Sequence, residues 1–127
     1  MKDVLLVGLG SFLGGSARYL VTLLIQSCTT IAFPLGTMTV NIAGCFFFGL
    51  FTGLNWTGNG MMTQSTKLLL TTGFCGGFTT FSTFMNEGTT LIKDGQFSPL
   101  AFYAAGSLVF GFLAVLAGNQ LAKAFTA

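Results

Sequence analysis

Long apolar stretches separated by short polar segments dominate this sequence. Residues 4–26, 35–56, 67–92 and 98–123 are each apolar over a length that suits a membrane span, since crossing a hydrocarbon core takes about 20 helical residues. A polar stretch that leads to Pro34, the run 57–60 and the run 93–96 divide them. The pattern predicts an all-α integral membrane protein in which residues 1–127 form a single domain of four transmembrane helices.

The composition points the same way. Charged residues make up 6% of the chain, hydrophobic residues 52%, and the mean hydropathy is +0.79. A soluble domain carries roughly 25% charged residues, so a soluble globular enzyme and a disordered chain are both excluded. A net charge of +2 provides no basic patch, and nucleic acid is not expected as a partner.

The residue types that perform covalent or acid–base catalysis are scarce. The chain has no histidine, its three cysteines lack CxxC spacing, and no predicted span holds paired carboxylates. The glycine-rich run at 73–77 lacks the Gly-Lys-Ser/Thr ending of a phosphate-binding loop. We therefore expect no enzymatic activity.

The third span has an unusual composition, because Gly73, Gly76 and Gly77 lie among hydroxyl residues in its middle. Glycine permits backbone conformations that a helix forbids. One interpretation is a helix broken at this point, whose freed carbonyl oxygens suit a small cation such as Na⁺. The other is that the glycines only pack against a neighbouring helix. The pattern favours neither.

Two stripes follow these glycines. Thr80, Thr83 and Glu87 share one helical face. A neighbouring face carries four phenylalanines: Phe74, Phe78, Phe81 and Phe84. Such an aromatic stripe is more often core than site, but this one borders hydroxyls and a carboxylate. The edge of a phenyl ring carries positive partial charge, so the stripe could also attract an anion.

Three other polar side chains lie within the spans. Asn41 shares a helical face with Thr37 and Gly44, and either an interhelical hydrogen bond or a substrate contact explains it. Tyr103 and Ser107 lie four residues apart on one face of the fourth span. An interfacial tyrosine with a packing serine is the simpler interpretation of that pair.

Arg18 is the one charged residue between residues 4 and 26. Three roles are open to it: extension to the membrane interface, which is the commonest fate, pairing with a carbonyl or carboxylate, or a positive potential at an anion entry.

The lysines specify orientation weakly. With alternating spans, Lys2, Lys67 and Lys123 lie on one side and Lys93 on the other. The lysine distribution is equally consistent with a single orientation and with insertion in both orientations, which would permit an antiparallel dimer. Small residues recur at four-residue spacing, which suits close helix packing within or between subunits, and we expect a homo-oligomer. The pairs are Gly10–Gly14, Gly49–Gly53, Ser107–Gly111 and Ala114–Gly118.

Three segments carry a family resemblance. The run from Gly73 to Phe84 resembles the signature of the CrcB/Fluc fluoride channels, and the runs 36–44 and 14–19 resemble their second-helix and first-helix motifs. The resemblance covers essentially the whole chain. It implies a channel that exports F⁻ across the bacterial inner membrane, as an antiparallel, dual-topology homodimer. It also implies two pores at the subunit interface and a central structural Na⁺.

The resemblance assigns roles to residues of this chain. Phe81 and Phe84 would contact fluoride by their ring edges, with Asn41 as the pore amide beside them. Arg18 would lie at a vestibule, and the backbone carbonyls of Gly76 and Thr79 would bind Na⁺. The polar track would continue through Ser82, Thr83, Tyr103, Ser107 and, near one mouth, Glu87.

Two other functions compete with this interpretation. A small multidrug-type, proton-coupled exporter has four spans too, but its first span holds a carboxylate that residues 4–26 lack. A non-transporting assembly or lysis factor gives Asn41 and the hydroxyl stripe no purpose.

Overall fold

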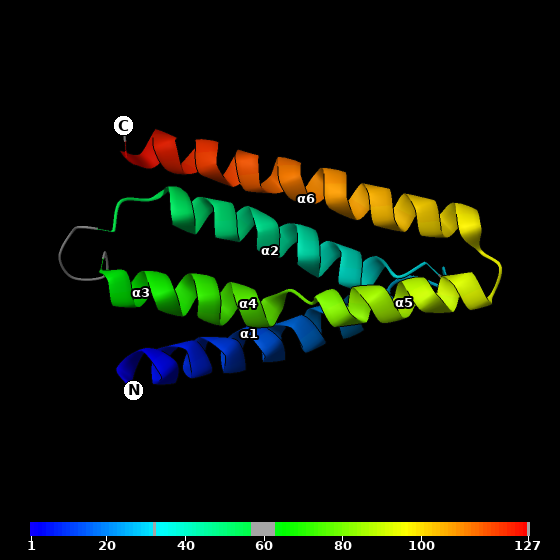
Figure 1. Ribbon diagram of the computed structural model, residues 1–127, viewed down its shortest axis with the longest axis horizontal. Coiled ribbons are helices and arrows are strands. Elements are labelled where there is room, and N and C mark those ends of the chain that lie inside the picture. The colour runs from blue at the N-terminus through cyan, green and yellow to red at the C-terminus, as the bar shows by residue number, and fades with distance from the viewer. Residues whose placement is uncertain (32, 57–62, 127) are drawn as a thin grey trace.

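The computed structural model describes residues 1–31, 33–56 and 63–126, and over these residues every regular element is helical. Figure 1 shows four elongated rods, formed by α1, α2, α6 and the row that runs from α3 to α5. The all-α prediction is therefore confirmed. The elements in chain order are α1 (Lys2–Ser27), α2 (Leu35–Gly53), α3 (Gln64–Leu68), the π-helix η1 (Leu69–Cys75), α4 (Gly76–Phe78), α5 (Phe81–Lys93) and α6 (Phe97–Thr126).

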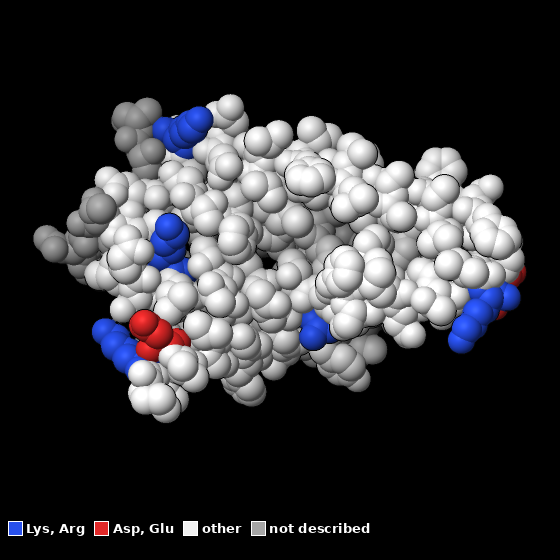
Figure 2. All heavy atoms as spheres, in the orientation of Figure 1, with Lys and Arg blue, Asp and Glu red and all other residues white. Residues whose placement is uncertain are grey.

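Three of the rods are single helices that are long and apolar enough to cross a membrane: α1, α2 and α6. In the most apolar stretch of α1, and likewise in that of α6, only 11% of the residues are buried within the chain. Most side chains of these two stretches are therefore at least partly exposed on the surface of the subunit. Charged side chains gather toward the two ends of the face in Figure 2, and the middle of that face is almost uncharged. Apolar flanks between charged ends are what a bilayer requires.

The observed helix bounds differ from the predicted spans by at most three residues, at the end of α2, the start of α3 and the end of α6. Helix α2 ends at Gly53, and not at residue 56 as predicted. Beyond it the buried Trp56 folds back locally, and its Nε1 donates a hydrogen bond to the carbonyl of Phe51 at 2.5 Å. The polar run predicted at 57–60 lies outside the described residues.

The third rod departs from helical geometry at Thr79 and Thr80. Helix α4 ends at Phe78, Thr79 has ψ 161° and Thr80 has φ −152° and ψ 121°, and α5 begins at Phe81. Of the two interpretations left open for the glycines, a break at their own backbone is not what the structure has, because Gly73 belongs to η1 and Gly76 to α4, and the departure follows three residues after Gly76.

Close packing explains two of these glycines. A Cβ on Gly73 would lie 3.0 Å from the Cα of Gly10, and one on Gly77 would lie 2.7 Å from the carbonyl oxygen of Ser11. Both positions let the third rod approach α1 without an intervening side chain. Gly76, by contrast, has no neighbour within 4 Å of such a Cβ and is exposed.

The small residues at four-residue spacing pack within the chain. Gly14 lies against the backbone of Phe74, and Gly49 and Gly118 bring α2 and α6 into backbone contact. Gly111 lies beside Cys45, whose Sγ is 3.6 Å from where a Cβ would be. Glycine contacts therefore join α1 to the third rod and α2 to α6.

Substituting Gly14 with alanine is expected to lower the stability of the bundle by about 1–3 kcal/mol, because the new methyl group meets backbone that cannot rotate away. Gly8→Ala on the same helix is the matched control, since nothing lies within 4 Å of its Cβ. Thermal unfolding in detergent measures both. Equal melting temperatures for the two variants would contradict the packing seam.

Candidate functional site

Asn41 of α2 binds the backbone at the departure from helix in the third rod. Its Nδ2 donates to the carbonyl of Thr80 at 3.1 Å, and its Oδ1 accepts from the Thr80 N–H at 2.8 Å. One side chain thus satisfies both backbone groups of a residue that has left the helix. The interhelical hydrogen bond considered for Asn41 is present, and its second amide hydrogen is left for another acceptor.

Arg18 of α1 approaches the same region from the other side. Its Nε donates to the carbonyl of Gly77 at 3.0 Å. In an unbroken helix this carbonyl would accept from the Phe81 N–H, four residues later. Of the three roles open to Arg18, the structure shows pairing with a carbonyl, and the side chain is half-buried.

The first turn of α5 gathers three hydroxyl groups. The Thr80 Oγ1 caps the helix by accepting from the Thr83 N–H at 3.3 Å, and it donates to the Thr83 Oγ1 at 3.1 Å. The Ser82 Oγ lies 3.4 Å from the Thr80 Oγ1 and is exposed. Thr80 therefore belongs to the cap, and not to the helical face on which the sequence placed it. A helix start combines free N–H groups with the positive end of the helix dipole, which favours an anion.

Aromatic rings continue from this turn into the bundle. The rings of Phe81 and Phe84 lie 6.1 Å apart at 64°, and those of Phe84 and Tyr103 lie 4.9 Å apart at 77°. In such edge-to-face pairs one ring turns its positive edge toward its neighbour. Phe81 is 72% exposed in the single chain, so it does not serve the core.

Tyr103 links α6 to the carboxylate on α5. Its hydroxyl donates to the Glu87 Oε1 at 2.8 Å, and the buried Thr37 side chain lies beside the same phenol. Tyr103 is completely buried within the chain. One turn further along α6, the Ser107 Oγ is buried and lacks a hydrogen-bond partner within the described part of the chain. A buried hydroxyl without a partner is costly unless water or an ion reaches it.

The carbonyl oxygens of Gly76 and Thr79 suit a hard cation by their chemistry. The Thr80 N–H, which would donate to the Gly76 carbonyl in a continuous helix, donates to Asn41 instead. Gly76 is exposed and Thr79 half-buried, so this stretch of backbone is reachable from outside the chain. Among the described residues no group of three or more His, Cys, Asp or Glu side chains could hold a metal.

Sequence reasoning missed two features of this region. The capping role of Thr80 has a local signal, because threonine is one of the residues preferred immediately before a helix. The Arg18–Gly77 contact joins residues 59 apart and leaves no such signal.

The sequence is similar to a described protein family and to named relatives over most of its length. Residues 5–119 match the family described as CrcB-like protein, Camphor Resistance (CrcB). The fluoride-specific ion channel FluC of Prosthecochloris aestuarii is 46% identical over 123 residues, which cover 97% of this chain and 94% of that protein. The FluC of Phocaeicola vulgatus is 45% identical over 123 residues, covering 97% and 100%. The FluC of Chlorobium luteolum is 47% identical over 121 residues, covering 95% and 92%.

Proposed function

Since the chain belongs to the CrcB-like family, we propose that it forms a fluoride-specific ion channel, the activity for which its relatives are named. The observation that carries the proposal is the meeting of an amide hydrogen, hydroxyls and ring edges at the first turn of α5. The chain is a multi-pass membrane protein. Relatives named as ion channels agree with the prediction that it is not an enzyme.

Fluoride is small and tightly hydrated, so a pore must replace its water with other donors. Asn41, Ser82 and Thr83 can donate hydrogen bonds, and Phe81 and Phe84 contribute ring edges. The track continues along Tyr103 and Ser107, whose unpaired hydroxyl suits an ion or water. Many weak contacts let an ion leave, whereas a strongly cationic site would trap it. The bilayer that this channel serves is the bacterial inner membrane.

A single chain forms only one wall of such a pore. Phe81 and Ser82 are exposed, so an ion beside them would lie on the outer surface of the subunit. A second copy would enclose it. We therefore keep the antiparallel, dual-topology homodimer with two pores at its interface as part of the proposal, supported by the weak lysine bias.

The same dimer supplies a place for a structural Na⁺. The carbonyls of Gly76 and Thr79 from each subunit would hold the ion, which supplies positive charge that draws the two broken rods together. Arg18 braces this backbone through Gly77, and its positive charge at the vestibule raises the local anion concentration. Glu87, held by Tyr103, would lie near one mouth of the polar track.

Purified protein in liposomes is expected to release fluoride down its gradient and to retain chloride. A fluoride electrode and a chloride electrode, each read against empty liposomes, measure the two fluxes. Release of both ions at the same rate, or of neither, would refute the proposed function.

Replacing Na⁺ with K⁺ throughout purification is expected to weaken dimerisation, because the larger ion fits a carbonyl site selected for Na⁺ less well. The measurement is the monomer–dimer equilibrium in detergent at a series of protein concentrations. Identical equilibria in both salts would argue against the central site while leaving the flux result untouched.

A further inference from the structure

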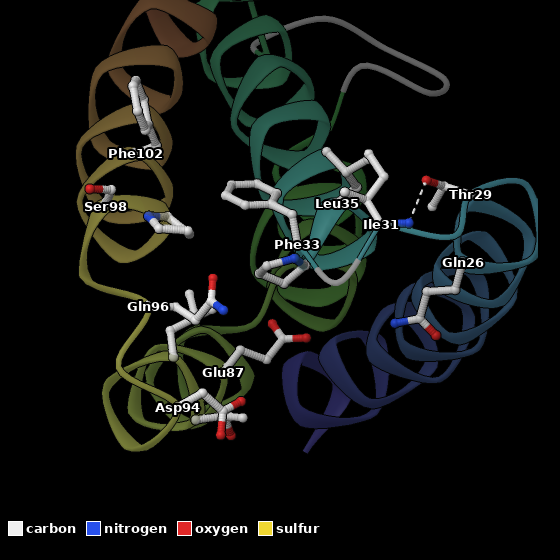
Figure 3. A pocket seen from close by; sticks show the side chains of 14 residues that line it. Gln26, Thr29, Ile31, Phe33, Leu35, Glu87, Asp94, Gln96, Ser98 and Phe102 are labelled. Atoms are coloured by element: carbon white, nitrogen blue, oxygen red, sulfur yellow. Dashed lines mark hydrogen bonds between the residues drawn. The ribbon is translucent and has the colours of Figure 1, made fainter.

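A cavity of about 680 Å³ lies at the end of the bundle where α1 joins α2 and α5 joins α6. Figure 3 shows it between these connections, with side chains from α1, α2, α5 and α6 around it. Its volume falls in the range of sites for small organic molecules, roughly 300–1,000 Å³. It lies at the opposite end of α5 from the first-turn hydroxyl groups.

The charges that line the cavity are all negative. Glu87 and Asp94 line it, and none of the five lysine and arginine side chains does. One oxygen of Glu87 accepts from Tyr103, which leaves the other oxygen free for a second partner. In Figure 3 the Glu87 carboxylate points into the space between Phe33 and Gln26. Among organic ligands, these charges favour a cation over an anion.

The residue types that line the cavity favour an organic cation over a metal ion. Phe33, Leu91 and Phe102 give the cavity apolar and aromatic surfaces. Among the described residues, no third His, Cys, Asp or Glu side chain joins the two carboxylates in a group that could hold a metal ion. Aromatic faces beside carboxylates are the chemistry that recognises substituted ammonium ions.

We propose that this cavity binds a soluble organic monocation with an apolar body, with its charge near Glu87 and Asp94 and its body against Phe33 and Phe102. The ligand class is that of aromatic or alkyl quaternary ammonium ions. The inference goes beyond the proposed function, because binding is measured without any transport.

Isothermal titration calorimetry on the full chain in maltoside micelles tests it, with empty micelles as the blank. Phenyltrimethylammonium is the probe. Benzenesulfonate, which has a similar size and the opposite permanent charge, is the comparison ligand. We expect a saturable heat for the cation at one site per chain and none for the sulfonate. The absence of saturable cation binding, or equal binding of both ions, overturns the proposal.

Three variants with the same charge change assign the site. Glu87→Gln keeps an acceptor for Tyr103, and it and Asp94→Asn are each expected to raise the Kd of phenyltrimethylammonium about tenfold. Asp3→Asn removes the third acidic side chain of the chain, which does not line this cavity, and should leave the Kd unchanged. An equal rise in Asp3→Asn, or no rise in either of the others, would show that the carboxylates of the cavity do not bind the ion.

Discussion

Replacing Asn41 with leucine is expected to reduce fluoride efflux at least tenfold and to lower the melting temperature of the protein. Leucine has nearly the same size but leaves the Thr80 N–H and carbonyl without their partner. Each unsatisfied backbone group costs about 1–3 kcal/mol. The start of α5 then loses its fixed position, and the amide hydrogen offered to the ion disappears. Efflux from liposomes and thermal unfolding in detergent measure the two effects.

Asn86→Leu is the matched control, because Asn86 is an exposed amide on α5 and the substitution is chemically identical. It should leave efflux and melting temperature close to those of the unchanged protein. Asn41→Asp separates the two hydrogen bonds, since a carboxylate still accepts from the Thr80 N–H but cannot donate to its carbonyl. Full efflux in Asn41→Leu would contradict both proposed roles of Asn41, in fixing the backbone of Thr80 and in contacting the ion.

The four rods could be predicted from the sequence because their determinants are local. Apolar length and polar separators placed the helices within a few residues of their observed bounds. One of these differences lies at the end of α2, where the indole of Trp56 donates back to the carbonyl of Phe51. Periodicity contains no information about such a contact.

The region around the break was only partly predictable, for a related reason. Glycine is compatible both with an irregular backbone and with close packing, and Gly73 and Gly77 serve the second purpose. The extended residues are Thr79 and Thr80, whose backbone is satisfied by Asn41, 39 residues earlier in the chain. Whether a helix breaks therefore depends on a partner that becomes visible only when the rods are assembled.

For the polar side chains, too, local spacing could be predicted from the sequence, whereas contacts between rods could not. The face shared by Tyr103 and Ser107 follows from helical spacing alone. The hydrogen bond from Tyr103 to Glu87 joins two rods across 16 residues. Sequence spacing thus identified the polar groups but not their pairing, and pairing decides which donors remain available to a ligand.

Replacing Phe84 or Phe81 with isoleucine is expected to suppress fluoride efflux at least tenfold while the protein stays assembled. Isoleucine keeps apolar bulk but has no positive ring edge to offer an anion. The two positions differ in their structural cost. Phe84 packs edge-to-face on Tyr103 at 4.9 Å, so its loss also removes about 0.5–1.5 kcal/mol of aromatic pairing. Phe81 is 72% exposed, so its replacement costs the subunit little.

Phe112→Ile provides the control, because that ring is 71% exposed on α6, away from the described hydroxyl groups. Efflux from liposomes measures function, and size-exclusion chromatography in detergent measures assembly. The Phe81 variant is the sharper test: a subunit of unchanged stability that no longer passes fluoride assigns the loss to the ring edge itself. If Phe81→Ile and Phe84→Ile both transport as fast as Phe112→Ile, the rings serve packing alone and the fluoride path must lie elsewhere in the molecule.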